Sequence, residues 1–344
     1  MNKNKILVTG GTGYIGSHTI VELQAKGFEV IVIDSLRNSF AGVLDQVEKI
    51  SGTKPKFYQF DLCEKIALED FFTKETNIDA IIHFAALKAV GESVENPLLY
   101  YKNNMLSLIN VLDAMSKFKI KNIVFSSSCT VYGQPDTLPV SEKAPMKKPE
   151  SPYGHTKQMA EQILSDVVIS SDLHVVSLRY FNPIGAHDSA LIGEFPIGAP
   201  NNLVPMITQT AMGIREKLLV FGDDYNTKDG SCIRDYIHVV DIAKAHVVAI
   251  ERLLENKNKQ AYEVFNLGTG FGFTVLETIK TFEKVSAQKL NYEITSRRSG
   301  DVEKVYADTL LANEELGWKA ERNLENMLST AWNWQLKLKD LKIK

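Results

Sequence analysis

A tyrosine and a lysine four residues apart, Tyr153 and Lys157, are the residues in this sequence best suited to acid–base chemistry. Four residues make slightly more than one turn of an α-helix, so the two side chains share one helical face. An ammonium beside a phenol favours the phenolate, and we expect it to lower the tyrosine pKa from its usual ~10 toward neutrality. Ser151 and Pro152 are typical of a helix N-cap and first helical position. The pattern predicts a general base at the start of a helix.

Three consecutive serines, Ser126, Ser127 and Ser128, follow a short apolar run at 123–125. The run predicts a buried parallel strand, whose carboxyl end lies at the edge where open α/β sheets bind ligands. A hydroxyl at Ser128 would there bridge a substrate oxygen and the phenol of Tyr153. A purely structural role for the serines is the alternative. We predict Ser128, Tyr153 and Lys157 as catalytic residues.

Three glycines at intervals of three, Gly10, Gly13 and Gly16, lie between an apolar run at 6–9 and a helix-like stretch at 14–26. The first permits a tight turn, the second lets the backbone approach a pyrophosphate, and the third lets the helix pack close to the sheet. The helix N-terminus then offers free N–H donors to the diphosphate. This pattern predicts a dinucleotide site.

Asp34 follows the next apolar run, 24 residues after Gly10. A carboxylate there accepts both ribose hydroxyls of NAD and repels the extra phosphate of NADP. We therefore predict NAD, although Arg37 slightly weakens the argument. Asp61 lies after the third predicted strand and is a candidate for the adenine amino group; the alternative is a turn residue.

Short apolar runs alternate with stretches of helical length in the first half of the chain, and this alternation is typical of a parallel sheet covered on both faces. We expect an α/β fold with a doubly wound Rossmann-type parallel sheet and a smaller C-terminal substrate-binding lobe. The domains are expected at 1–181, binding NAD, and 182–344, with some segments returning to the main sheet. Strands are predicted at 6–9, 30–33, 57–60, 80–84, 122–127 and 175–178, and helices include 14–26 and 98–118.

The composition of the 344 residues is ordinary for a globular protein, with a formal net charge of −3. We therefore expect no general attraction to nucleic acid or to a membrane surface. Cys63, Cys129 and Cys232 are too widely spaced for a metal cluster or a disulfide framework, which favours a reducing compartment. The chain contains no run of about 18 apolar residues. We expect a cytoplasmic protein without a membrane span, a signal peptide or a metal.

The glycine loop, Asp34, Ser128 and the Tyr153–Lys157 pair together resemble the extended short-chain dehydrogenase/reductase family. Longer motifs are similar to those of the UDP-glucose 4-epimerase family, and the resemblance covers about residues 5 to 335 in order. It implies a permanently bound NAD and a UDP-sugar that is transiently oxidised at carbon 4. The motifs are IHFAALKAVGES at 82–93, RYFNPIGAH at 179–187, PNNL at 200–203, RDYIHV at 234–239 and RRSGD at 297–301.

The resemblance implies further contacts with each ligand. For the cofactor they comprise backbone groups at the pyrophosphate (Tyr14, Ile15), neighbours of the adenosine (Ser35, Asn38, Ser39, Leu62) and residues along the dinucleotide (Phe84, Ala85, Lys88, Asn103, Phe181). For the uridine diphosphate they comprise Asn182, Asn202, Leu203, Phe221, Arg234, Arg298 and Asp301. Arginines suit a diphosphate because they donate from a planar fork.

One position departs from the family pattern. A bulky aromatic residue often stands where this chain has Val305, and a smaller side chain leaves room for a 2-acetamido group. We therefore add the hypothesis that UDP-N-acetylglucosamine and UDP-N-acetylgalactosamine are also substrates.

Three other functions are alternatives to epimerisation. Nucleotide-sugar 4,6-dehydratases resemble this chain but carry an Asp-Glu pair where Cys129 and Thr130 stand here. A dehydrogenase of a single substrate is disfavoured by the UDP-anchoring motifs, and a non-catalytic NAD-binding protein by the intact Tyr153 and Lys157. A homodimer is also expected, through 98–118 and the helix after Tyr153; the alternative is that both helices only pack on the sheet.

Overall fold

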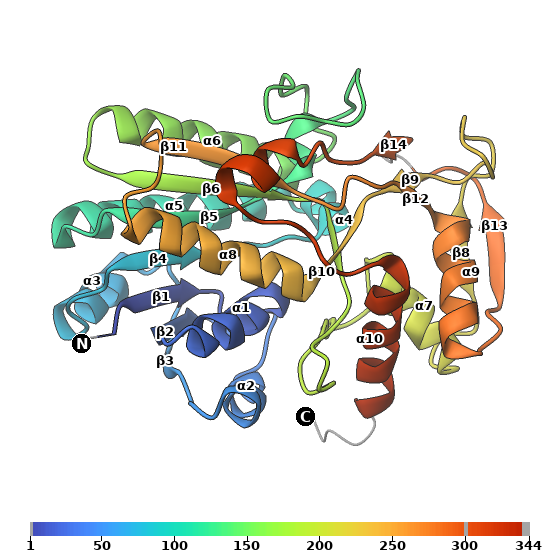
Figure 1. Cartoon of the computed structure of the whole chain (residues 1–344), viewed down its shortest axis with the longest axis horizontal. Coiled ribbons are helices and arrows are strands. Elements are labelled where there is room, and N and C mark those ends of the chain that lie inside the picture. Colours follow the sequence, from blue (N-terminus) through green and yellow to red (C-terminus); the bar gives the residue numbers. More distant parts are fainter. Residues whose placement is uncertain (1–2, 299–301, 339–344) are drawn as a thin grey trace.

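The computed structural model describes residues 3–298 and 302–338, and a seven-stranded parallel sheet forms its centre (Figure 1). The strand order is β11-β6-β5-β4-β1-β2-β3, which is a doubly wound arrangement and confirms the predicted fold class. Six of the strands match the six predicted from the apolar runs to within two residues at each end. The strands are β1 (Lys5–Thr9), β2 (Glu29–Asp34), β3 (Lys56–Gln59), β4 (Ala80–His83), β5 (Asn122–Ser128), β6 (His174–Tyr180) and β11 (Tyr262–Leu267).

Helices cover both faces of the sheet, which explains why its strands are apolar without alternation. Ile6 and Val8 face one core together with α1 (Tyr14–Ala25), α2 (Val43–Ser51) and α8 (Val239–Leu254). Leu7 faces the other core, with α3 (Lys65–Lys74), α5 (Pro97–Phe118) and α6 (Pro152–Ile169). Successive residues of one strand thus enter opposite cores. The short α4 (Val90–Glu95) precedes α5.

A smaller lobe with its own apolar core lies at one end of the molecule, on the right in Figure 1. Two late segments lie against the main sheet and its helices: β11 pairs with β6, and α8 packs against α1. The elements of the lobe and of its junction with the sheet are β7 (Asn182–Ile184), α7 (Leu203–Ala211), β8 (Leu218–Phe221), β9 (Ile233–Arg234), β10 (Tyr236–His238), β12 (Phe273–Thr274), α9 (Val275–Ser286), β13 (Tyr292–Thr295), β14 (Lys304–Val305) and α10 (Leu324–Lys337).

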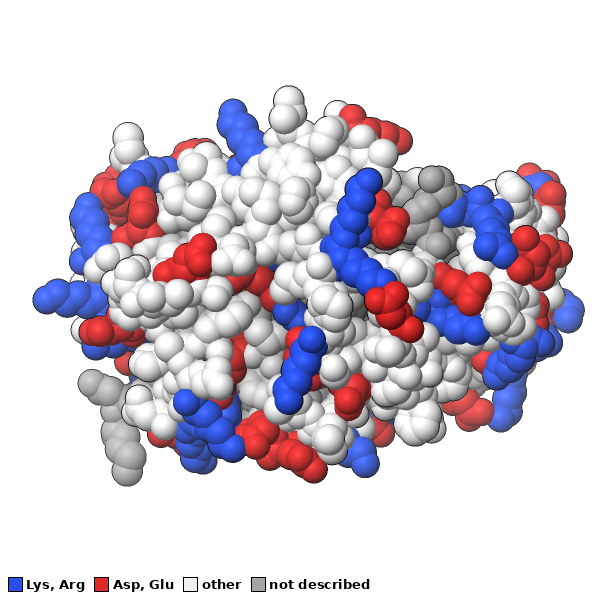
Figure 2. Space-filling model, turned by 90° about the horizontal axis from the view of Figure 1, so that it is seen from above, with Lys and Arg blue, Asp and Glu red and all other residues white. Residues whose placement is uncertain are grey.

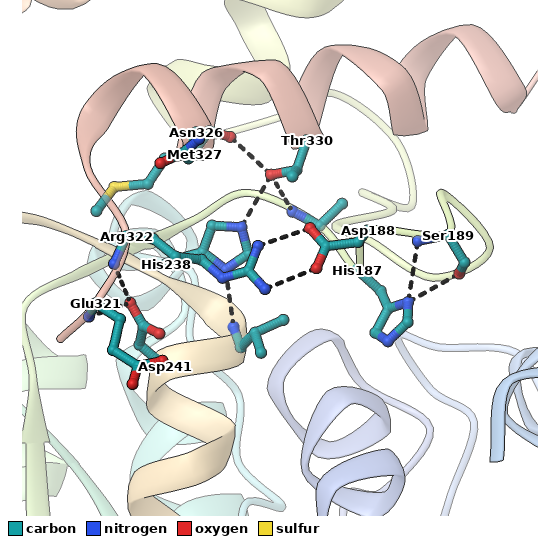
Figure 3. A network of polar contacts seen from close by, with 12 residues as sticks. His187, Asp188, Ser189, His238, Asp241, Glu321, Arg322, Asn326, Met327 and Thr330 are labelled. Atoms are coloured by element: carbon teal, nitrogen blue, oxygen red, sulfur yellow. Dashed lines mark hydrogen bonds and ion pairs between the residues drawn. The ribbon is translucent and has the colours of Figure 1, made fainter. Parts of the chain in front are cut away.

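A polar network ties the lobe to the main domain (Figure 3). The guanidinium of Arg322 donates to both carboxylate oxygens of Asp188, at 2.6 and 2.7 Å. The backbone N–H of Arg322 donates to Asp241 at 3.1 Å, near the start of α8. His238, the N-cap of α8, is hydrogen-bonded to the hydroxyl of Thr330 in α10 over 2.9 Å. The network fixes the segment that follows β7 against both α8 and α10.

Charged side chains of both signs are interspersed over the face shown in Figure 2, in keeping with the small net charge. Among residues 3–298 and 302–338, no helix is long and apolar enough to cross a membrane.

Candidate active site

Tyr153 and Lys157 lie in the first two turns of α6, and the local sequence explains why the helix begins there. Ser151 is the N-cap, and its hydroxyl accepts a hydrogen bond from the N–H of Gly154 at 3.1 Å. Pro152 occupies the first helical position, where its missing N–H costs nothing. The predicted cap and the predicted start of the helix are both confirmed.

The Lys157 side chain is buried and reaches back to strand β5. Its ammonium donates to the main-chain oxygen of Ser126 at 2.5 Å and lies 4.8 Å from the ring centroid of Phe125. The centroid of the Tyr153 ring is 5.9 Å away. The ammonium is therefore fixed between the strand and the tyrosine.

Ser128 is the last residue of β5, and its hydroxyl oxygen accepts a hydrogen bond from the N–H of Thr130 at 3.2 Å. The serine side chain favours the phenolate of Tyr153 and thereby acts to lower its pKa. The structure thus brings Ser128, Tyr153 and Lys157 together at the carboxyl end of the sheet.

The pKa of Tyr153 differs from the value that its spacing from Lys157 predicts. Burial raises this pKa to about 12, since removal from water disfavours the phenolate. Burial also lowers the pKa of Lys157 to about 8, against the opposing charge of Glu161. The predicted shift of Tyr153 toward neutrality is therefore wrong for the protein chain by itself. The physical reason is that the ammonium is directed at the Ser126 carbonyl and the Phe125 ring, while desolvation acts on the whole phenol.

The glycine loop joins β1 to α1 in the form that a dinucleotide site needs. Gly10 has φ +70°, and a Cβ there would lie 2.7 Å from the backbone nitrogen of Ala85. A Cβ on Gly16 would collide with the carbonyl oxygen of Gly10. Gly13 is the N-cap of α1 and has no side chain that could bond the N–H groups of the first helical turn, where Tyr14 and Ile15 lie. These donors remain available to a pyrophosphate.

Asp34 lies at the end of β2 and faces this loop. One carboxylate oxygen accepts from the N–H of Thr12 at 3.1 Å; the other accepts from the N–H of Leu36 at 2.9 Å and from the hydroxyl of Ser39 at 3.1 Å. Thr12 and Ser39 are also hydrogen-bonded to each other over 2.7 Å. The predicted ribose site is thus a preformed network, and Thr12 is a member that sequence reasoning missed. Ser35 and Asn38 are exposed beside it.

The remaining expected cofactor residues occupy several elements around the loop. Phe84 and Ala85 follow β4, and Ala85 is the residue that approaches Gly10. Phe181 is buried after β6, and Asn103 lies on α5. The side chain of Asp61 accepts from the N–H of Cys63 at 2.9 Å, and the Leu62 carbonyl accepts from Asn110 at 2.8 Å.

Lys88 and Asn202 both contact Glu194, a residue that was not among those predicted from the sequence. Asn202 donates to one oxygen of Glu194 at 2.6 Å, and the ammonium of Lys88 lies 3.4 Å from the same oxygen. Lys88 is also 5.9 Å from the ring centroid of Tyr14. Glu194 lies in a loop without a recognisable motif, so no sequence signal marks it. This carboxylate joins an expected cofactor contact to an expected substrate contact.

The residues expected around the uridine diphosphate lie on the lobe side. Asn182 begins β7, and its buried Oδ1 has no hydrogen-bond partner among the described residues. Leu203 follows Asn202 at the start of α7. Arg298 places its guanidinium 5.6 Å from the ring centroid of Phe221. Asp301 lies outside the described residues.

Arg234 and Val305 connect this side to the catalytic residues. The two are paired in register between β9 and β14. Val305 is 6% exposed and shares an apolar cluster with Phe181, against which Cys129 packs. Burial raises the pKa of Cys129 to about 12, and the charge of Arg234 opposes this shift. The charge of Arg234 thus acts on Cys129, the residue that follows Ser128.

Comparisons with known proteins agree with this arrangement. A family model described as GDP-mannose 4,6 dehydratase matches residues 7–331. A UDP-glucose 4-epimerase of Bacillus subtilis is 52% identical over 331 residues, which are 96% of each chain. The Bifidobacterium longum UDP-glucose 4-epimerase structure in complex with NAD+ and UDP has a TM-score of 0.94 and 46% identity, covering 98% of this chain and 99% of that one. The Stenotrophomonas maltophila enzyme with bound NAD and formylated UDP-arabinopyranose matches with the same TM-score, 0.94, the same identity, 46%, and the same coverage, 98% and 99%. The chain belongs to the UDP-glucose 4-epimerase family, within the broader family described as GDP-mannose 4,6 dehydratase.

Proposed function

We propose that this protein interconverts UDP-glucose and UDP-galactose by transient oxidation at carbon 4 of the sugar, with NAD as a permanently bound cofactor. The observation that carries the proposal is the meeting of Ser128, Tyr153 and Lys157 at the sheet edge, beside a glycine loop that admits a pyrophosphate. The family relationship supplies the substrate class.

The fit of the chain to NAD rests on three features of the main domain. Gly10 and Gly16 leave no space for a side chain, the start of α1 has no side-chain cap, and Asp34 is held by Thr12 and Ser39. The dinucleotide is expected along Phe84, Ala85, Lys88, Asn103 and Phe181. In this proposal residues 1–181 bind NAD and 182–344 mainly bind the UDP-sugar.

Each catalytic residue has a separate role in proton transfer. When bound, NAD supplies a positively charged nicotinamide that accepts and returns a hydride, and its charge adds to that of Lys157 in favouring the phenolate. Tyr153 removes the proton of the 4-hydroxyl, and Ser128 holds the sugar oxygen against the phenol. Lys157 places its ammonium 5.9 Å from the centroid of the Tyr153 ring. Ser128 acts against the burial that raises the Tyr153 pKa, and the charges of Lys157 and of bound NAD would act in the same direction.

The lobe holds the part of the substrate that does not react. Arg234 and Arg298 provide guanidinium groups for the diphosphate, and Asn182 offers a buried amide oxygen. A firm grip on the nucleotide leaves the sugar ring free to turn about the diphosphate and present its other face. Binding energy from the nucleotide then retains the 4-keto sugar until it is reduced.

The residues after Ser128 argue against dehydration. Elimination of water requires an acid, and Cys129 and Thr130 occupy the positions of the Asp-Glu pair of dehydratases. Burial raises the pKa of Cys129 to about 12, so the thiol keeps its proton near neutral pH and is a poor acid. Epimerisation, which needs only one proton-transfer group, remains the reaction that the site supports.

A second substrate pair is favoured by one observation. Val305 is paired with Arg234 and packs in the cluster that contains Phe181, so it stands between the expected diphosphate and nicotinamide contacts. Its small side chain favours turnover of UDP-N-acetylglucosamine and UDP-N-acetylgalactosamine as well.

The expected assembly and location are also part of the proposal. Val94 on α4 and Leu98 on α5 are 60% and 80% exposed, and they support a homodimer formed through α5 and α6. Cys63, Cys129 and Cys232 are free thiols, which supports a reducing, cytoplasmic setting.

Product analysis of the purified protein tests the proposal. The protein is incubated separately with UDP-glucose, UDP-galactose and the two N-acetylated UDP-sugars, without added NAD, and the products are separated by chromatography. We expect each plain sugar to yield the other. Absence of any interconversion, or formation of a 4-keto-6-deoxy product, would refute it.

A further inference from the structure

A buried ion pair lies directly behind the catalytic residues. Arg179 donates from Nε to one carboxylate oxygen of Glu161 at 2.9 Å and from Nη2 to the other at 2.6 Å. The two side chains are 5% and 2% exposed. A pair this deep has given up its hydration, so removal of one partner leaves the other charge uncompensated.

Glu161 lies on the same helix as two of the catalytic residues. It stands four residues after Lys157 in α6, as Lys157 stands four residues after Tyr153, so the three follow one face of the helix. The Ser127 hydroxyl donates to Glu161 at 2.5 Å, which fixes the residue immediately before Ser128. One carboxylate thus holds both the catalytic helix and the end of the catalytic strand.

Through Ser127 and Arg179, the Glu161 carboxylate is connected to further strands of the sheet. Ser127, Arg179 and Asn266 are register partners on the adjacent strands β5, β6 and β11. Arg179 donates to the hydroxyl of Tyr132 at 2.8 Å, and that hydroxyl donates to Asn266 at 2.6 Å. The network spans three strands at the level where the sheet ends and the site begins.

Asn266 carries the network on to the substrate lobe. Its amide donates to the carbonyl oxygen of Val140 at 2.8 Å. Val140 in turn forms a β-bridge with Ala307, in the segment that follows β14. A continuous set of hydrogen bonds therefore runs from α6 to the segment directly after β14, the strand that carries Val305.

We propose that Glu161 is a positioning residue of the active site, which holds Ser128, Tyr153 and Lys157 in one arrangement through its bonds to Ser127 and Arg179. It touches neither substrate nor cofactor and acts through its neighbours. The inference rests on the proposed epimerase function. The same carboxylate favours the Lys157 ammonium, against the burial that lowers the Lys157 pKa.

The chain offers a matched control in a second buried pair. Glu263 accepts from Arg252 at 2.7 and 2.9 Å and from the N–H of Lys259 at 2.8 Å, so it also receives three hydrogen bonds. Glu263 lies near the amino end of β11, whereas Ser128 lies at the carboxyl edge of the same sheet. Glu263→Gln therefore reports the cost of disturbing a buried pair away from the site.

The test compares Glu161→Gln and Glu263→Gln with the wild-type holoenzyme in UDP-galactose turnover across pH. For Glu161→Gln we expect kcat to fall about 10- to 100-fold with KM within about threefold, because misplaced catalytic groups affect mainly the chemical step. The alkaline limb of its kcat profile should move at least about half a pH unit lower, because Lys157 then loses its proton more easily. Glu263→Gln should keep the kcat and the limb of the wild type.

A milder variant keeps the proposal falsifiable if Glu161→Gln does not fold. Ser127→Ala removes one of the three hydrogen bonds and leaves the ion pair, and we expect kcat to fall about three- to tenfold. Unchanged kcat and limb in the Glu161 variant, equal losses in the Glu161 and Glu263 variants, or an unaffected Ser127→Ala would each overturn the positioning role. An inactive wild-type protein would instead refute the proposed function.

Discussion

Asn202 donates a hydrogen bond of 2.6 Å to Glu194, although the two residues have different roles in the fold. Asn202 is the N-cap of α7 in the substrate lobe, whereas Glu194 belongs to the preceding loop, and its backbone oxygen accepts from the Trp334 indole at 2.9 Å. The same carboxylate oxygen of Glu194 is near Lys88 from the main domain. The loop therefore connects residues expected at the two ligand sites, and we expect it to couple the sites.

Glu194→Gln should weaken the binding of UDP about three- to tenfold. The substitution removes the negative charge beside Lys88 and replaces the carboxylate that accepts from Asn202 with a weaker amide acceptor. Titration calorimetry of the holoenzyme with UDP measures the effect. Glu69→Gln is a suitable control because Glu69 pairs with Lys117 on an exposed surface of α3 and α5. Equal UDP affinity in Glu194→Gln and wild type would remove this coupling from the account.

Tyr153→Phe should lower kcat at least about 1000-fold, because the variant keeps the ring but loses the group that accepts the 4-hydroxyl proton. Bound NAD should be retained, since the glycine loop and Asp34 are untouched. A coupled UDP-galactose assay and chromatography of the nucleotide released on denaturation measure the two quantities. A Phe variant with more than about a tenth of wild-type activity contradicts the role of the phenol.

Ser128→Ala should change the pH dependence as well as the rate. In the proposed mechanism the phenolate is the active form, so activity is expected to rise with pH as Tyr153 loses its proton. Ser128 acts to lower the pKa of Tyr153, and its removal should shift the acid limb of the kcat profile to higher pH. We also expect kcat to fall about 10- to 100-fold at neutral pH. An acid limb that stays in place, or moves to lower pH, would show that Ser128 does not support the phenolate.

Much of the main domain could be predicted from the sequence, because local signals are strong there. Unbroken apolar runs predicted six of the seven strands of the main sheet, and Ser151-Pro152 predicted the start of α6. The lobe was harder, since its strands are as short as two residues and pair across long sequence separations, as β9 does with β14. Such pairings leave no period in the sequence.

The pKa values and hydrogen-bond partners of the site residues could not be predicted from residue spacing. A four-residue interval shows that Lys157 shares a face with Tyr153, but not that its ammonium bonds the carbonyl of Ser126. Burial of the phenol, which raises the pKa of Tyr153, depends on packing from several elements. For the same reason no sequence signal marks Glu161 or Glu194, since each pairs with a residue distant in the sequence, Ser127 and Lys88 respectively.

Val305→Tyr should separate the two proposed substrate pairs. A bulky ring at this buried position would occupy the space left for a 2-acetamido group, so turnover of UDP-N-acetylglucosamine should fall at least about 100-fold. Turnover of UDP-galactose should stay within about threefold of wild type. Parallel kinetics with both sugars measure the ratio; a wild-type enzyme without N-acetyl turnover would end the hypothesis.

The central claim is that one carbon is oxidised and then reduced within a single site, with Tyr153 exchanging the hydroxyl proton. UDP-galactose carrying deuterium at carbon 4 is incubated with the purified protein without added NAD, and the UDP-glucose formed is analysed by mass spectrometry and NMR. The account predicts UDP-glucose that retains the deuterium at carbon 4. Loss of the deuterium to water would contradict it.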